Sequence, residues 1–231
     1  MNLLDLIFPK FCVNCKKMGD YLCPNCFTHL SMDVSSICLV CTKPSYDGLT
    51  HPGCQSKNNI EGSFTGVVFN ITAKKLVHAI KYKPYLRDLA EFLTEILYES
   101  LIQNEEFDRI KNKNLILVPI PLNNNKFKKR GYNQAEVLAN KLGEKLNFKV
   151  LNLLERTRDT KSQVGLNKIE RKLNIEGAFE INKKYSSEIK NKNIILVDDI
   201  LTTGATFSEA TKILKKNGAG KIWAIAFAKE D

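Results

Sequence analysis

Two adjacent carboxylates, Asp198 and Asp199, follow a run of four apolar residues at 194–197. Such a run predicts a strand that is buried on both faces. A short loop of threonine and small residues comes next, at 202–206, and the apolar periodicity from Phe207 predicts a helix behind it. Ligands of open α/β sheets bind beyond the carboxyl ends of the strands, and a loop entering a helix offers backbone N–H groups to a phosphate. The stretch therefore predicts carboxylates for hydroxyl groups or a metal ion beside a phosphate-binding loop, as a sugar phosphate requires.

Two other nucleotide-binding patterns place acidic or small residues after a strand, and both lack a required motif here. A Walker B strand needs a partner of the form G-x-x-x-x-G-K-[ST], and a dinucleotide-binding fold needs G-x-G-x-x-G. The sequence contains neither. The remaining alternative is a buried strand with two solvated aspartates and an ordinary turn. We favour the sugar-phosphate site because all its parts stand at the spacing that it needs.

A second group of reactive side chains lies in the first quarter of the chain, which holds all seven cysteines. The spacing forms four half-sites of potential metal ligands: Cys12-x-x-Cys15, Cys23-x-x-Cys26, Cys38-x-x-Cys41 and His51-x-x-Cys54. An odd number of cysteines argues against a disulfide framework, and paired C-x-x-C motifs predict tetrahedral Zn²⁺ sites. Closed four-ligand sites are structural, so the metal would contribute folding energy to a module too small for a core of its own.

The sequence leaves the number of zinc ions and the pairing of the half-sites open. Imidazole is an ordinary ligand of Zn²⁺, so a site of three cysteines and His51 is chemically sound. The alternative is that His51 is a loop histidine without a metal, which would leave one zinc ion. A crossed pairing, in which the half-sites alternate between two ions, is also compatible with the spacing.

Length and composition set the frame for both sites. The 231 residues suffice for one large domain and a small one, and we expect a zinc-binding domain at 1–58 and an α/β domain at 59–231. The apolar runs are too short to span a membrane, and the start lacks the basic region of a signal peptide, so we expect a cytoplasmic protein. The net charge of +10 suits a polyanionic partner, although we favour a solvated lysine-rich surface as its explanation.

Strands and helices alternate from residue 63 onward, which predicts parallel βαβ units. We expect strands at 63–70, 115–121, 150–154, 178–181, 194–197 and 221–228, and helices at 73–82, 86–102, 134–142, 166–174 and 207–217. Residues 123–130 read as a basic loop at a strand's carboxyl end, either solvated or anion-binding. The polar segment 156–163 suits a lid over the site or an ordinary surface loop.

The run at 195–206, an apolar strand followed by Asp-Asp and Thr-Thr-Gly-Ala-Thr, resembles the signature of type I phosphoribosyltransferases. The whole chain is similar to the ComF family of competence proteins, whose motifs recur here in the same order. They are the cysteine module, Lys81-Tyr82, Val118-Pro119-Ile120-Pro121-Leu122, Arg130-Gly131-Tyr132-Asn133-Gln134-Ala135, Thr160-x-x-Gln163-x-x-Leu166, Arg171-x-x-Asn174, Gly177-Ala178-Phe179 and the Asp-Asp stretch. His51 departs from the family, which commonly has cysteine there.

The resemblance implies the parallel-sheet fold of type I phosphoribosyltransferases, preceded by a small zinc-ribbon module. It also implies a site for phosphoribosyl pyrophosphate with Mg²⁺. Asp198 and Asp199 would bind the ribose hydroxyl groups, and the loop residues would bind the 5′-phosphate. The implied loop residues are Thr202, Thr203, Gly204, Ala205 and Thr206. Lys81 and Arg130 are candidates for binding pyrophosphate, and Lys161 or Arg158 would act from the lid.

The family is associated with the uptake of single-stranded DNA in natural transformation, and two functions follow. The first is an enzyme that transfers the phosphoribosyl group to an unidentified acceptor, with Asp198, Asp199 and Lys161 as its catalytic residues. The second is a non-catalytic protein that handles single-stranded DNA and retains the fold and the zinc module. Aromatic Phe127 and Tyr132 flank the basic residues and are candidates for stacking on bases. Implied partners are single-stranded DNA and other competence proteins, such as a DNA-translocating helicase.

Overall fold

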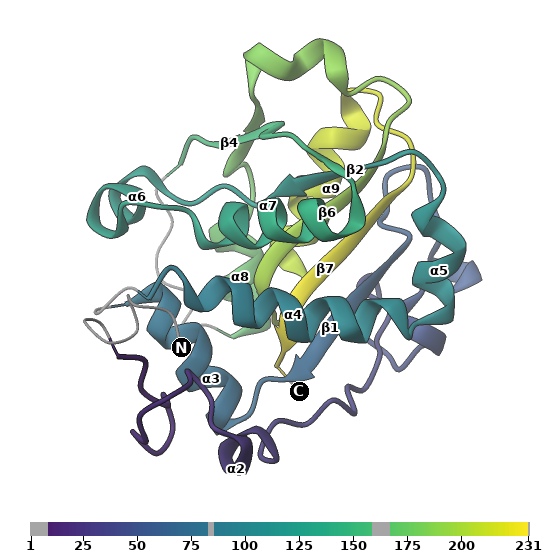
Figure 1. Ribbon diagram of the computed structural model, residues 1–231. Helices are drawn as coiled ribbons and strands as arrows, with labels where there is room; N and C mark the ends of the chain where they lie inside the picture. Colours follow the sequence, from purple (N-terminus) through teal and green to yellow (C-terminus); the bar gives the residue numbers. More distant parts are fainter. Residues whose placement is uncertain (1–8, 83–85, 159–166, 231) are drawn as a thin grey trace.

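A five-stranded sheet with the order β1-β7-β6-β2-β3 forms the centre of the molecule in a computed structural model, which describes residues 9–82, 86–158 and 167–230 (Figure 1). Its strands are β1 (Gly62–Val68), β2 (Leu115–Pro119), β3 (Lys149–Val150), β6 (Asn193–Leu201) and β7 (Ile222–Lys229). All neighbouring strands of this sheet are parallel. The predicted fold class, a parallel α/β sheet, is therefore confirmed, and the carboxyl ends of the strands share one edge.

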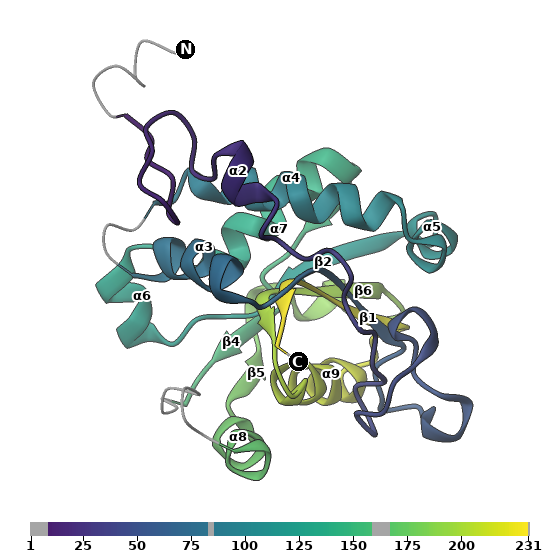
Figure 2. The ribbon, with the colours of Figure 1, turned by 90° about the horizontal axis from the view of Figure 1, so that it is seen from below.

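Helices cover both faces of this sheet because alternate residues of its strands are buried on opposite sides. The helices are α3 (Ile71–Lys81), α4 (Leu89–Ile102), α5 (Glu105–Lys111), α6 (Asn124–Arg130), α7 (Gln134–Leu146), α8 (Lys168–Ile175) and α9 (Ala205–Lys216). In β6, Ile195 and Val197 join a core with α3, α4 and α7, while Leu196 joins a second core with α9. Figure 2 shows α4 and α7 on one side of the sheet and α9 on the other.

A small antiparallel sheet stands beside the main one and consists of β4 (Leu154–Arg156) and β5 (Phe179–Ile181). The predicted single strand at 150–154 is therefore wrong: it is divided between β3 and β4. The chain turns between them, where the Leu153 amide donates to the Leu151 carbonyl over 3.0 Å. Helix α8 precedes β5 and packs with it against α9. Arg171 of α8 is 2.8 Å from Glu230, which ties α8 to the end of β7.

Two further local predictions are corrected by the structure, and one helix was not predicted. The basic segment 123–130 forms α6 rather than a loop, because Asn123 caps the amides of Asn125 and Lys126 and Gly131 ends the helix at φ 83°. Helix α5 was not predicted, although Asn104 caps it in the same way. Strand β6 continues through the aspartates to Leu201 instead of ending before them.

The cysteine-rich region has little regular structure, and its two halves contact different parts of the sheet domain. It contains α2 (Pro24–Phe27), η1 (Tyr46–Gly48) and η2 (Pro52–Cys54), and the other 3-10 helix, η3 (Lys183–Glu188), lies in the sheet domain. The first half lies near α3 and α4, and the second half lies beside β1 (Figure 2). None of the helices in the described ranges is long and apolar enough to cross a membrane.

Candidate functional site

Asp198 and Asp199 lie near the end of β6, in the centre of the sheet, where the strands have their carboxyl ends. The Asp199 side chain is only 4% exposed, and its Oδ2 atom lies 2.6 Å from Nζ of Lys81 at the end of α3. Asp198 is half-buried, and its Oδ1 atom accepts a 2.8 Å hydrogen bond from the Asp199 amide. The structure thus brings together three residues that the sequence predicted separately for ribose and pyrophosphate.

The two carboxylates differ in their electrostatic surroundings. Burial raises the pKa of Asp198 to about 8, and the negative charge of Asp199 adds to this rise. The ammonium group of Lys81 acts in the opposite direction and lowers the pKa of Asp198. Two adjacent acids with one nearby cation therefore hold less than their full charge at neutral pH. A ligand that brings hydroxyl donors or a cation to this edge would favour the ionised pair.

The loop after β6 has the form that a phosphate-binding loop requires. Gly204 adopts φ 73°, a left-handed conformation that favours glycine, and stands at the N-cap of α9. The first turn of α9 contains no acidic residue, so the positive end of the helix dipole is not neutralised from within the helix. Thr202, Thr203 and Ala205 are half-buried around this turn. The loop thus places small, half-buried residues at the start of α9, directly after the strand that carries Asp198.

A series of hydrogen bonds connects this edge to the turn after β2. The amide of Ile120 donates to the Val197 carbonyl over 2.9 Å, directly before the aspartates. The side chain of buried Asn133 donates to the Ile120 carbonyl over 3.0 Å, and its oxygen caps α7. The hydroxyl of Tyr132 donates to the carbonyl of Ile80, the residue before Lys81.

Tyr132 and Asn133 therefore position the turn after β2 and the end of α3 against β6. The sequence predicted no positioning role for either residue: both belong to the motif 130–135, Asn133 stands before the predicted helix at 134–142, and Tyr132 was a candidate for base stacking. Tyr132 is half-buried, with its hydroxyl bonded to Ile80 and the Arg87 guanidinium 5.9 Å from its ring centre. Their membership of that motif was the available signal.

The remaining predicted cations have different positions. Arg130 is the last residue of α6 and donates to the side chain of Gln134. Arg158 donates to the carbonyls of Asn174 over 3.0 Å and Glu176 over 2.6 Å, so it holds the end of α8. Lys161 lies outside the described residues, as does most of the segment 156–163 that was predicted to form a lid.

A cavity of about 390 Å³ opens beside the turn after β2, between α6, the start of α7 and β4. Pro119, Pro121 and Phe127 form apolar parts of its lining, and Glu136 and Arg156 are among the polar ones. Phe127 is 44% exposed on α6. The cavity therefore combines apolar walls with both signs of charge, and it lies next to a helix that carries several cations.

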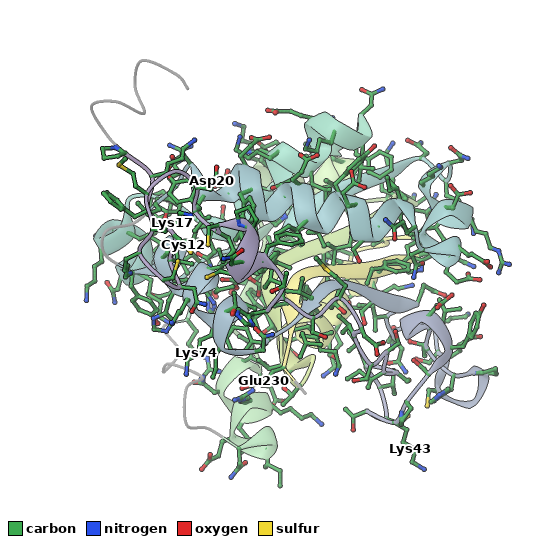
Figure 3. The ribbon with its side chains drawn as sticks, turned by 60° about the horizontal axis from the view of Figure 1, so that its bottom comes forward. Cys12, Lys17, Asp20, Lys43, Lys74 and Glu230 are labelled. Carbon is green, nitrogen blue, oxygen red and sulfur yellow. The ribbon has the colours of Figure 1, made fainter. Side chains whose placement is uncertain are left out.

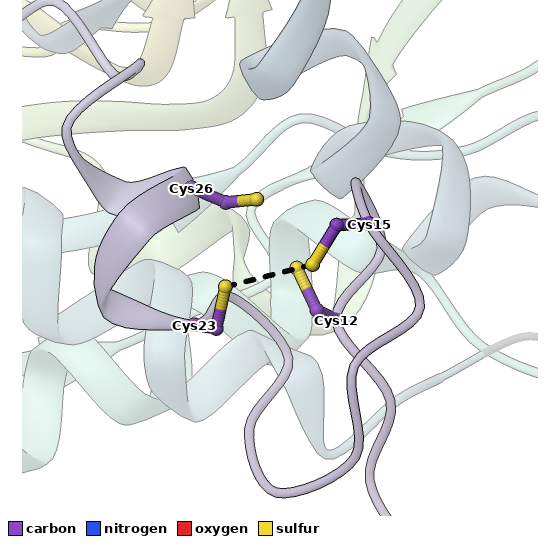
Figure 4. Close-up of side chains that lie close together, drawn as sticks. All are labelled: Cys12, Cys15, Cys23 and Cys26. Atoms are coloured by element: carbon purple, nitrogen blue, oxygen red, sulfur yellow. Dashed lines mark hydrogen bonds between the residues drawn. The ribbon is translucent and has the colours of Figure 1, made fainter.

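The cysteines and His51 form two separate clusters, each with four ligand atoms within 4.8 Å of one another. The first contains Cys12, Cys15, Cys23 and Cys26 (Figure 4), and the second contains Cys38, Cys41, His51 and Cys54. The half-sites thus pair in sequence order, and the crossed pairing is wrong. Figure 3 shows the separation: Cys12 and Lys17 lie at one side of the molecule, and Lys43 of the second half lies at another.

The chemistry of both clusters fits a divalent cation. Burial alone would raise the pKa of Cys12, but hydrogen bonds from the amides of Cys15 and Cys23 lower it to about 6. In contrast, Asn14 lowers the pKa of Cys26, but burial and the neighbouring sulfurs outweigh it and raise the pKa to about 12. Four thiolates can therefore coexist here only if a cation compensates their charge, which is what Zn²⁺ does.

The second cluster shows the same features, with an imidazole in place of one thiol. Burial alone would raise the pKa of Cys38, but backbone amides lower it to about 7, whereas burial and the neighbouring thiols raise the pKa of Cys54 to about 11. Nε2 of His51 lies 3.0 Å from the Pro44 carbonyl, and Nδ1 lies 3.3 Å from Cys41 Sγ. An Nε2–H donated to that carbonyl leaves the Nδ1 lone pair for a metal.

Comparisons with known proteins match both parts of the chain. Residues 90–230 match the model of the phosphoribosyl transferase domain, and residues 3–55 match that of the double zinc ribbon domain. The chain is 30% identical over 208 residues to Competence protein ComFC of Streptococcus pneumoniae, covering 90% of this chain and 80% of that protein. It is 33% identical over 139 residues to Competence protein F of Haemophilus influenzae, covering 59% and 60% of the two chains. DNA utilization protein YhgH of Escherichia coli K12 is 27% identical over 153 residues, 65% of each chain.

Proposed function

Because the chain belongs to the ComF family of competence proteins, with a double zinc ribbon and a phosphoribosyltransferase domain, we propose that it binds phosphoribosyl pyrophosphate and transfers its phosphoribosyl group. One observation carries this proposal: the Lys81–Asp199 ion pair and the half-buried Asp198 share a sheet edge with the glycine turn that begins α9. Carboxylates, a cation and a phosphate loop are the groups that the three parts of this ligand need.

Each part of the proposed site has a distinct task. Asp198 and Asp199 accept hydrogen bonds from the ribose hydroxyls, and the amides of the loop 202–206 bind the 5′-phosphate. Lys81 and Arg130 bind pyrophosphate, with Lys161 as a third cation. Mg²⁺ bound with the ligand would supply further positive charge to the leaving group. When the C1–oxygen bond breaks, its electron pair leaves with pyrophosphate, and the acceptor's electron pair then forms the new bond to C1.

The protein's contribution to catalysis is electrostatic. The transition state has positive charge on the ribose ring and negative charge on the departing pyrophosphate, so carboxylates near the ring and cations near the phosphates stabilise it. In this arrangement the ion pair with Lys81 also holds the Asp199 side chain in place before the ligand arrives.

We further propose that two Zn²⁺ ions occupy the two clusters and that they are structural. Each cluster supplies four ligands, the number of a closed tetrahedral site. The module would comprise residues 1–58, and the phosphoribosyltransferase domain residues 59–231. The names of the relatives support a role in competence or DNA utilization, with single-stranded DNA and other competence proteins as partners.

Calorimetric titration with phosphoribosyl pyrophosphate and Mg²⁺ tests the ligand. We expect the double variant Asp198→Asn, Asp199→Asn to lose affinity by about 100-fold or more, since two charge-assisted hydrogen bonds contribute about 1.5–3 kcal/mol each. Asp108→Asn, on the exposed face of α5, is the matched control and should bind as the wild type does. Equal affinity of the double variant and the wild type would disprove the proposal. Pyrophosphate release with a panel of bases and oligonucleotides then identifies the acceptor.

A second function, binding of single-stranded DNA, is favoured by the surface of α6. This helix carries exposed Lys128 and Lys129, and the neighbouring Phe127 is 44% exposed and lines the cavity. Lysines that contact phosphates release counterions, so the affinity falls with salt. An aromatic ring that is open to solvent can stack on a base.

Binding of an oligothymidine at several salt concentrations tests this second function. Replacing Lys128 and Lys129 by alanine should reduce the slope of log K against log salt by about 0.7 for each lost phosphate contact. The control replaces two exposed lysines elsewhere, Lys183 and Lys190. An unchanged slope in the α6 variant would count against DNA binding by this helix without affecting the phosphoribosyl site.

A further inference from the structure

A leucine of the second metal cluster lies against the phosphate-binding loop. Leu39 stands between Cys38 and Cys41 and is only 4% exposed. A Cβ atom placed on Gly204 would lie 3.1 Å from Leu39 Cδ2 and 3.5 Å from Leu39 Cβ. The loop backbone at Gly204 therefore rests directly on the Leu39 side chain. The absence of a side chain at Gly204 permits both this close approach and the φ of 73°.

The metal cluster holds Leu39 in place from one side. Cys38 is fully buried, its amide donates to the Lys43 carbonyl over 3.0 Å, and its carbonyl accepts from the Thr42 amide over 2.7 Å. These bonds fold the residues 38–43 into a tight turn around the ligands. A bound Zn²⁺ would join both ends of the C-x-x-C segment and fix Leu39 between them.

The sheet domain holds Leu39 from the other side. Leu39 belongs to the same buried apolar cluster as Leu201, the last residue of β6, and Phe207, in the first turn of α9. These two residues flank the loop 202–206, so the apolar cluster that Leu39 joins continues on both sides of that loop. Polar contacts also join the two modules here; for example, Nζ of buried Lys229 donates to Ser35 Oγ over 3.2 Å.

The first cluster has a different neighbour and provides an internal comparison. Cys12 and Cys26 belong to the other buried core, together with Leu76 and Ile80 of α3. Asn14 accepts a 2.7 Å hydrogen bond from Lys75 of the same helix. Leu22 precedes a cluster cysteine, as Leu39 follows one, and is equally buried at 4% exposure. The first cluster thus contacts α3, and the second contacts the phosphate-binding loop.

We propose that Leu39 is a positioning residue for the phosphate-binding loop, held there by the second metal cluster. This inference rests on the proposed function of the loop as the 5′-phosphate site. Without the leucine, the glycine at the centre of the loop gains conformational freedom, which binding must then remove. The zinc module would thereby act on ligand affinity without contacting the ligand.

Titrations of two fragments of the ligand test this role. Leu39→Ala should weaken binding of ribose 5-phosphate about tenfold, because the loop must be ordered on binding. It should leave the affinity for pyrophosphate with Mg²⁺ unchanged and retain two zinc ions. Leu22→Ala is the matched control and should retain wild-type affinity for ribose 5-phosphate. Leu39→Met, which keeps the volume, should restore binding.

Amide hydrogen exchange provides a readout that does not depend on a ligand. In Leu39→Ala, amides of the loop 202–206 should exchange faster than in the wild type, and in Leu22→Ala they should not. Three results would overturn the inference and leave the proposed function standing. They are an equal loss of affinity for ribose 5-phosphate and for pyrophosphate, equal effects of the two leucine variants, and unchanged amide exchange in the loop. Failure of the wild type itself to bind ribose 5-phosphate would overturn both. If Leu39→Ala does not fold, Leu39→Val permits the same measurements.

Discussion

Lys81 and Asp199 form an ion pair, with 2.6 Å between Nζ and Oδ2, that joins the end of α3 to the carboxyl end of β6. The lysine side chain is 20% exposed and the aspartate 4%, so the pair lies at the boundary between the core and the site. Such a pair adds little to the free energy of folding, because the cost of desolvation offsets much of the Coulomb attraction. Its main effect is to fix the positions of the two side chains. Its consequence is a cation held at the sheet edge before any ligand binds.

Removal of this cation should affect both stability and binding. Lys81→Met keeps the apolar stem but leaves Asp199 buried without its partner, and breaking a buried pair on one side costs about 3 kcal/mol. We expect a lower free energy of unfolding in urea and at least tenfold weaker binding of phosphoribosyl pyrophosphate. Lys74→Met, on the exposed face of the same helix, is the control. An Lys81→Met protein with wild-type stability would contradict the proposed importance of the pair.

The raised pKa of Asp198 predicts a specific dependence of stability on pH. Its folded-state pKa of about 8 lies above the ordinary value of 3.8, so the folded state binds the proton more tightly. The resulting stabilisation is complete below the ordinary value and is lost as the pH rises through about 8. An asparagine does not titrate, so Asp198→Asn has no such loss. The free energy of unfolding of the variant should therefore rise relative to that of the wild type between pH 5 and pH 9.

The measurement is the difference in melting temperature between the two proteins across that range of pH. A relative gain of about 1 kcal/mol corresponds to about 2–4 °C for a chain of this size. Asp108→Asn, whose parent carboxylate pairs with Lys111 at the surface, serves as the comparison and should show no such trend. A constant difference between Asp198→Asn and the wild type would mean that Asp198 is ionised throughout.

Most strands of the main sheet and the glycine turn before α9 could be predicted from the sequence, because both depend on local patterns. Four apolar residues before Asp198 indicated a central strand, and Gly204 indicated a turn into a helix. The contact between Lys81 and Asp199 could not be predicted from periodicity, since it depends on how α3 packs beside β6. The same holds for Leu39, whose position inside a metal-binding motif gave no indication that it touches Gly204.

Local patterns also failed where short elements depend on single caps. The segment 123–130 lacks an apolar stripe and therefore read as a loop, yet Asn123 and Gly131 enclose a helix there. Likewise, Arg158 was a candidate for binding the ligand from a lid. Its guanidinium instead donates hydrogen bonds to the carbonyls of Asn174 and Glu176 at the end of α8. Charge and polarity alone do not distinguish a ligand-binding arginine from one that caps a helix.

Tyr132 offers a test of the contacts that position Lys81. Tyr132→Phe removes the hydroxyl that donates to the Ile80 carbonyl, which should cost about 1 kcal/mol. Because that carbonyl precedes Lys81, we expect several-fold weaker binding of pyrophosphate and little change for ribose 5-phosphate. Tyr98→Phe, another half-buried tyrosine, is the control. A loss that is equal for the two fragments would indicate a general loosening of the site and exclude a specific role for Tyr132.

Metal analysis should find two zinc ions in each chain, and binding of the second ion should depend on His51. His51→Ala removes an imidazole whose Nε2 is 3.0 Å from the Pro44 carbonyl and whose Nδ1 faces the cluster. Since a site with three ligands binds zinc more weakly, we expect one zinc to be lost at chelator concentrations that leave both in the wild type. His29→Ala, at an exposed histidine, should keep both ions. His51→Cys restores a fourth ligand and should recover the second zinc, whereas two tightly held ions in His51→Ala would show that His51 is not a ligand.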